Sequence, residues 1–179
     1  MTVAAEIAQL GNPVLRQYAA AVVDVHTDEI RDIIATMQST LAATSGVGIA
    51  APQIGIAKQI IIIASRPTPR YPSAPLMEPT VMINPGFDVL TDSREKDWEG
   101  CLSIPGIRAL VPRYRDIIIH YTDQGGAVVK MQLSGFVARI FQHEVDHLEG
   151  KTYLDRVENN VDIVAESEFF KLISATQPS

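Results

Sequence analysis

The sequence has a single cysteine, no hydrophobic run long enough to cross a membrane and no excess of basic residues. Cys101 cannot form an internal disulfide, which suits a reducing compartment. Its side chain is therefore a small buried apolar group, a metal ligand or a reactive thiol. A spanning helix needs about 20 apolar residues, and the N-terminus lacks a basic region followed by an apolar run. The net charge of −6 is spread along the chain, without a basic patch. We therefore expect a soluble protein that binds neither membrane nor nucleic acid.

The length of the chain favours one domain. Its 179 residues suffice for a single sizeable core, and neither low-complexity stretches nor internal repeats divide them. We expect residues 1–179 to form one domain, with residues 175–179 as a frayed tail.

Helices are predicted near both ends of the chain. Residues 27–44 have Thr27 at the position of an N-cap and Asp28 and Glu29 in the first turn. Their apolar side chains follow helical spacing, at Ile30, Ile33, Ile34, Met37 and Leu41. Residues 159–174 carry the last helical pattern.

Strands are predicted for the middle of the chain. The β-branched run at 58–65 and residues 80–90 are typical of strands, and residues 115–123 and 127–135 flank a "QGG" turn as a hairpin. Residues 66–79 hold five prolines and are expected to form a loop, either a lid or a long connection. Strands between helices indicate an α+β domain, not a parallel βαβ array.

One more helix is predicted at residues 136–149, with Ser134 and Gly135 before it and Gly150 after it. At about 100° per residue, its two histidines, His143 and His147, project from one face about 40° apart. They could share a metal ion, and Glu144 would lie at the rim near a bound water, as a metal hydrolase requires.

The H-E-x-x-H pattern favours a metal site over a helix with two surface histidines, because it arises by accident in only about one such chain in a few hundred. A catalytic site needs a third protein ligand. His120, in a strand, and His26, in a loop, are poor candidates, whereas Cys101 lies on an extended segment that could approach the helix. Asp146 is either a hydrogen-bond acceptor behind a ligand or an exposed acid.

Three segments, "GVGIAAPQ" (46–53), "EGCLS" (99–103) and "QHEVDHLEG" (142–150), resemble the signature motifs of peptide deformylases, in that family's order. "LGNPVLRQYA" (10–19) and "LDRV" (154–157) also resemble family sequence, so the likeness covers nearly the whole chain. The resemblance implies an α+β fold of mainly antiparallel sheets packed around a central metal-binding H-E-x-x-H helix, with an N-terminal amphipathic helix and a C-terminal helix.

The resemblance also implies a metal and a reaction. Cys101, His143 and His147 would hold one divalent ion, with water as the fourth ligand. We expect iron(II), with zinc(II), nickel(II) or cobalt(II) as alternatives in a purified sample, because a thiolate with two imidazoles suits several of these ions. The reaction would be hydrolysis of the N-formyl group from the formyl-methionine of nascent polypeptides, with release of formate.

Residue roles follow from the same resemblance. Gln53, through its side-chain amide, and Leu102, through its backbone N–H, would donate to the developing oxyanion, while Glu144 would carry the proton. The substrate would meet five further residues: Gly48, Val47, Phe136 and Ile140 around the methionine, and Arg108 near the peptide backbone. A glycine-lined segment lets an extended peptide approach closely, and we expect the peptide to add as a strand beside residues 46–53.

A bacterial-type, cytoplasmic enzyme is favoured, because the recognisable domain begins within a few residues of Met1. The expected partners are N-formyl-Met nascent chains at the ribosome exit. Two other classes stay open. A zinc endopeptidase would take its third ligand from a downstream carboxylate, for which Glu158, Glu166 and Glu168 are candidates, and a non-catalytic relative would only bind peptide.

Overall fold

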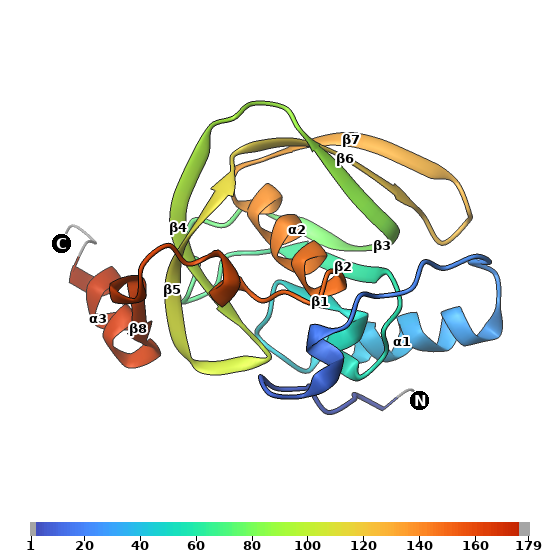
Figure 1. Ribbon diagram of the computed structural model, residues 1–179, viewed down its shortest axis with the longest axis horizontal. Helices are drawn as coiled ribbons and strands as arrows, with labels where there is room; N and C mark the ends of the chain where they lie inside the picture. Colours follow the sequence, from blue (N-terminus) through green and yellow to red (C-terminus); the bar gives the residue numbers. More distant parts are fainter. Residues whose placement is uncertain (1–2, 176–179) are drawn as a thin grey trace.

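The computed structural model describes residues 3–175, and Figure 1 shows its arrangement. A five-stranded antiparallel sheet has the order β1-β2-β3-β6-β7. Its strands are β1 (Gly48–Ala50), β2 (Ile60–Ser65), β3 (Met77–Val89), β6 (Asp116–Thr122) and β7 (Val128–Ser134). A three-stranded antiparallel sheet consists of β4 (Arg94–Cys101), β5 (Ile104–Tyr114) and β8 (Ile163–Ala165), in that order.

Within residues 3–175, three α-helices accompany the sheets: α1 (Asp28–Ala42), α2 (Gly135–Leu148) and α3 (Glu166–Ala175). The same part of the chain has four short 3-10 helices, η1 (Pro13–Arg16), η2 (Ala51–Ile54), η3 (Tyr153–Arg156) and η4 (Asn160–Asp162). In Figure 1, α2 runs through the middle of the molecule, and it contacts strands of both sheets. The predicted α+β fold, antiparallel and built around this helix, is confirmed. No helix among residues 3–175 is long and apolar enough to span a membrane.

The isoleucine run of β2 explains how the core is divided. Alternate side chains of a strand point to opposite faces of its sheet. Ile61 and Ile63 join the cluster that packs on α2, whereas Ile60 and Ile62 join the cluster that packs on α1. A strand buried on both faces therefore carries a continuous apolar run, and the sheet is held between the two helices.

The predicted helix at 27–44 is confirmed as α1, and its cap is the predicted one. The hydroxyl of Thr27 accepts a hydrogen bond from the Ile30 N–H at 3.3 Å. The predicted hairpin is also confirmed, as β6 and β7.

Two predictions of local structure were wrong in part. The proline-rich loop ends before Met77, because β3 begins there. Pro79 is tolerated inside β3 because the pairing of β3 with β2 shifts register between Ile63 and Ser65, which interrupts the hydrogen-bond ladder at that point. Residues 159–165 are not part of the α-helix but form the 3-10 turn η4 and strand β8, since β8 pairs with β5 and this tertiary pairing overrides the helical pattern. The glycine-bearing segment at 46–53 includes strand β1. The predicted fray of residues 175–179 lies, beyond Ala175, outside the described residues.

Candidate active site

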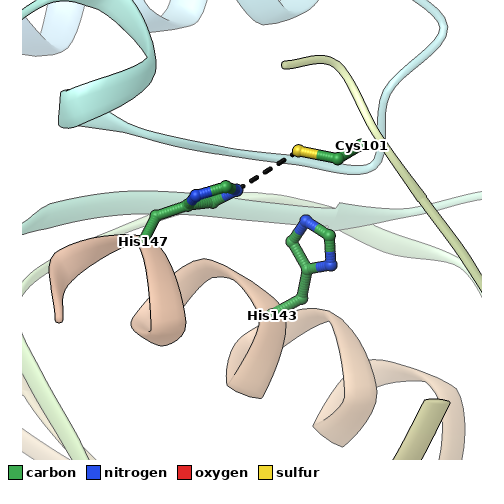
Figure 2. A group of neighbouring side chains, drawn as sticks. All are labelled: Cys101, His143 and His147. Carbon is green, nitrogen blue, oxygen red and sulfur yellow. Dashed lines mark hydrogen bonds between the residues drawn. The ribbon is translucent and has the colours of Figure 1, made fainter. Parts of the chain in front are cut away.

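The histidines of α2 and the cysteine that ends β4 meet beside the helix (Figure 2). One ligand atom from each of Cys101, His143 and His147 lies within 4.8 Å of the others. Cys101 Sγ is 3.3 Å from His147 Nε2. This is the one such group of possible metal ligands found in the described part of the chain.

A buried carboxylate orients the ring of His143. His143 Nδ1 lies 3.0 Å from Glu99 Oε2, which leaves its other nitrogen for the site. Burial raises the pKa of Glu99, but Arg113 and His143 outweigh burial and hold that pKa well below its usual range. Glu99 is therefore a carboxylate acceptor behind a candidate ligand, the arrangement that fixes the ring of a metal-bound histidine. The sequence analysis missed this role, although Glu99 lies two residues before Cys101 and so on the same face of a strand.

A buried network of charges holds Glu99. Arg113 donates from Nε to Glu99 Oε1 at 2.8 Å and from Nη2 to Oε2 at 3.0 Å, and Arg139 Nη1 donates to Oε1 at 3.0 Å. Arg113 Nη1 also reaches Asp146 at 2.6 Å, and Arg156 donates to the same carboxylate. Asp146 is thus neither an exposed acid nor a partner of a histidine; it joins the arginines that support the site.

Glu99→Gln is expected to lower the affinity for the metal by about 10-fold to 100-fold, because a neutral amide is a weaker acceptor for the His143 N–H than a carboxylate is. Metal titration with a competing chelator measures the change. Glu95→Gln is the matched control, since Glu95 lies on the same strand with an exposed side chain paired to Arg115. Equal affinities for the two variants would contradict the role given to Glu99.

Glu144 lies next to the proposed metal ligands but, unlike Glu99, is not held by any of the described arginines. It is 4 % exposed, and its Oε2 has no hydrogen-bond partner among the described residues. Burial raises the pKa of Glu144 to about 7, against the opposing effect of the two histidines. Its carboxyl is thus buried at the site without a structural partner for one oxygen.

Gly48 makes room for that carboxylate. A Cβ built on Gly48 would lie 2.9 Å from Glu144 Cδ and closer still to Oε1. Because real Cβ atoms do not approach so near, any side chain at position 48 must displace Glu144.

Gly48→Ala is therefore expected to lower kcat by about 10-fold to 100-fold, since even a 1 Å misplacement of reacting groups is costly. An assay of the formate release expected from the sequence measures the effect. Gly125→Ala is the control, because its Cβ would meet only the flexible Asp123 side chain, at 3.3 Å. A fully active Gly48→Ala enzyme would show that the position of Glu144 is unimportant.

Gln53 and Leu102 flank the cysteine. Gln53 is 1 % exposed; its Oε1 accepts from the Ala50 N–H at 2.9 Å, and its Nε2 donates to Ser103 Oγ at 3.1 Å and lies 3.5 Å from Cys101 Sγ. This fixes the amide with its nitrogen toward the site. Leu102 begins the two-residue connection between β4 and β5, directly after the thiol.

A cavity of about 340 Å³ opens on these residues. All five residues predicted to contact substrate line it: Gly48, Val47, Arg108, Phe136 and Ile140. Tyr71 of the proline-rich loop also lines it, with its ring centroid 4.7 Å from that of Phe136. Sequence reasoning missed Tyr71, because proline content marks a loop but not what the loop covers.

The three alternative third ligands are paired with cations instead. Glu158 pairs with Lys96, Glu168 with Lys171, and Glu166 with two arginines. None belongs to the group of metal-ligating side chains.

Comparison with known proteins agrees with this geometry. A family model described as polypeptide deformylase matches residues 4–162. This chain belongs to the polypeptide deformylase family. Peptide deformylase 2 of Nostoc sp. is 51 % identical over 168 residues, 94 % of each chain, and peptide deformylase 1 of Nitrosomonas europaea is 45 % identical over 84 % of this chain and 86 % of its own. A Met-Ala-Ser-bound class I type b peptide deformylase from Acinetobacter baumannii superposes with a TM-score of 0.85 at 40 % identity, covering 88 % of this chain and all of that one.

Membership confirms the predicted activity. Deformylases are metallohydrolases that remove the N-formyl group from nascent peptides, and this activity is assigned to the chain. Neither the endopeptidase nor the non-catalytic alternative is favoured.

The donor set fits the divalent ion that the deformylase family implies. A thiolate and two imidazoles are soft and borderline ligands, suited to iron and zinc, and three protein ligands leave a position open. Burial raises the pKa of the Cys101 thiol, but His147 and His143 outweigh it and hold the pKa well below its usual value, which favours the thiolate that binds metals.

Proposed function

We propose that this deformylase holds its divalent ion through Cys101, His143 and His147 and hydrolyses the formyl group of N-formyl-Met peptides beside that ion. The observation that carries the proposal is the convergence of these three donors next to the buried carboxyl of Glu144. Iron(II) is our proposed resident ion, with zinc(II), nickel(II) or cobalt(II) able to replace it in a purified sample. Metal analysis of anaerobically purified protein tests the identity.

The ion and the residues around it have different roles in the proposed hydrolysis. The ion, when bound, supplies a Lewis acid that lowers the pKa of water and polarises a carbonyl oxygen. Glu144 accepts the proton of the attacking water and returns it to the leaving amine. The amide of Gln53 and the N–H of Leu102 donate to the oxygen on which negative charge develops.

The cavity receives the methionine side chain. Val47, Phe136 and Ile140 supply its apolar wall, Gly48 lets the peptide backbone come close, and Arg108 adds a charged side chain to the lining. β1 is an edge strand, because it ends the strand order and pairs, among the described residues, with β2 alone. An extended substrate can therefore add beside residues 46–53 through main-chain hydrogen bonds.

The cellular setting is part of the proposal. We propose that the enzyme acts in the cytoplasm on N-formyl-Met nascent chains, at the ribosome exit. Fractionation of cells that express the tagged protein, with and without ribosome-stabilising salt, tests both the compartment and the association.

Mass spectrometry of a reaction with N-formyl-Met-Ala-Ser tests the proposed reaction. We expect one product, lighter by the formyl group, and one equivalent of formate. N-acetyl-Met-Ala-Ser is the control, because its larger acyl group retains an amide but yields no formate. Cleavage at an internal peptide bond would instead support the endopeptidase.

A further inference from the structure

The first residue of the C-terminal helix reaches the active-site cavity. Glu166 begins α3 and lines the cavity, although α3 lies beyond residues 4–162, which the family model matches. Its two carboxylate oxygens bind different arginines. Oε2 lies 3.0 Å from Arg108 Nε, and Oε1 lies 3.2 Å from Arg70 Nη2.

Arg108, the first of these two arginines, is held in place by its neighbours. The Arg108 side chain is 4 % exposed, and its Nη1 donates to the Tyr71 hydroxyl at 2.9 Å. The guanidinium lies against Gly100, where a Cβ would come within 2.7 Å of Nε, and its carbon is 5.5 Å from the ring centroid of Phe169. Phe169, on α3, is 1 % exposed. Arg108 and the buried face of α3 thus fix the position of Glu166.

Arg70, the second arginine, is partly exposed where it lines the cavity, and we call Arg70, Glu166 and Ser45 the cavity mouth. The side chain of Arg70 is 29 % exposed, and that of Glu166 is 26 % exposed. Arg70 Nη1 donates to Ser45 Oγ at 3.0 Å, and Ser45 also lines the cavity. Arg70 therefore spans from the segment before β1 to α3, with its cation open to solvent and to substrate.

The proline-rich loop is built to hold Arg70 in place. Backbone hydrogen bonds join Thr68 and Tyr71 in both directions, at 3.1 and 3.0 Å. Pro69 and Pro72 flank the Arg70–Tyr71 pair and restrict its backbone. The Tyr71 ring rests on Phe136 in the cavity wall. The loop thus presents one arginine over the cavity from a rigid turn.

We propose that Arg70 is a specificity-determining residue that favours formyl-Met peptides with an acidic side chain in the third position, and that Glu166 is its positioning residue. The inference rests on the proposed function, because it assumes that the methionine occupies the cavity and that the following residues leave past its mouth. Of the two arginines that bind Glu166, Arg70 is the exposed one, at 29 % against 4 % for Arg108. A carboxylate on the peptide can therefore pair with Arg70 while Glu166 stays bound to Arg108.

Steady-state kinetics on N-formyl-Met-Ala-Asp and N-formyl-Met-Ala-Lys test the inference. The parent is expected to prefer the Asp peptide in kcat/KM, and Arg70→Gln is expected to reduce the Asp-to-Lys ratio by about tenfold, through KM, because it removes one charged hydrogen bond. Arg66→Gln is the matched control: Arg66 lies on the same loop, is exposed and does not line the cavity, so the ratio should stay as in the parent.

A second pair of variants tests the positioning role. Glu166→Gln is expected to reduce the Asp-to-Lys ratio by about threefold, because Arg70 keeps its charge but loses a charged partner that holds it. Glu168→Gln, on the exposed face of the same helix and paired with Lys171, should leave the ratio unchanged. An Asp-to-Lys ratio near one in the parent, or equal losses on both peptides in Arg70→Gln, would overturn the proposal.

Calorimetry with the peptides Met-Ala-Asp and Met-Ala-Lys gives a readout that needs no turnover. The parent should bind the Asp peptide more tightly, and Arg70→Gln should remove the difference, whereas equal affinities in the parent would count against Arg70. A parent that releases no formate would contradict the proposed function, yet these affinities would still decide the role of Arg70.

Discussion

Glu144→Gln is expected to lower formate release from N-formyl-Met-Ala-Ser by about 10²-fold to 10⁴-fold while the protein keeps its metal, because a positioned proton carrier contributes an effect of that size. Glutamine keeps the shape of the side chain but cannot accept the proton of water. Glu144 is buried beside the ligands, and one of its oxygens has no hydrogen-bond partner among the described residues. Its loss should therefore affect chemistry more than folding. Formate release under saturating peptide, with metal content measured on the same sample, provides the test.

Glu149→Gln is the control for this variant. Glu149 follows α2, and its exposed side chain pairs with Lys151 at 2.7 Å, so full activity is expected. If Glu144→Gln retained both metal and parental turnover, another group would have to move the proton.

Cys101→Ser is expected to weaken metal binding by at least about 100-fold and to abolish formate release in parallel. The thiolate is the only anionic ligand of the proposed set, and a serine hydroxyl does not ionise near neutral pH. Without the thiolate, the two histidines are the remaining protein ligands, whereas catalytic metal sites normally have three. Metal titration by calorimetry, after removal of the bound ion with a chelator, gives the affinity directly.

Retention of metal by Cys101→Ser would contradict the proposed ligand set and reopen the case for a downstream carboxylate. The structure argues against that outcome, because Glu158 and Glu168 pair with lysines and Glu166 with arginines. The circular dichroism spectrum of the variant should match that of the parent, which separates lost ligation from lost fold.

Local periodicity predicted the helix that carries the site. Helical spacing was enough to place His143 and His147 on one face, and the extended segment around Cys101 was enough to suggest an approach to that face. The structure brings all three together. Their roles, like those of Gln53 and Leu102, stay predictions until the variants are measured.

Long-range pairs could not be predicted in this way. Arg108 and Glu166 are 58 residues apart, and Arg113 and Asp146 are 33 apart, with no local pattern that joins them. The segment 159–165 shows the same limit, since its pairing with β5 decided its conformation against a helical pattern. A single domain over residues 1–179 also stays a prediction, and one cooperative unfolding transition would support it.

Metal-dependent formate release shows whether the chain is a deformylase whose metal is held by one cysteine and two histidines. Anaerobically prepared protein is stripped with a chelator, reloaded with iron(II) in steps and assayed with N-formyl-Met-Ala-Ser. We predict no release without metal and a rate that rises in proportion to bound iron, up to one equivalent. Protein that holds one equivalent of metal yet releases no formate would contradict the account.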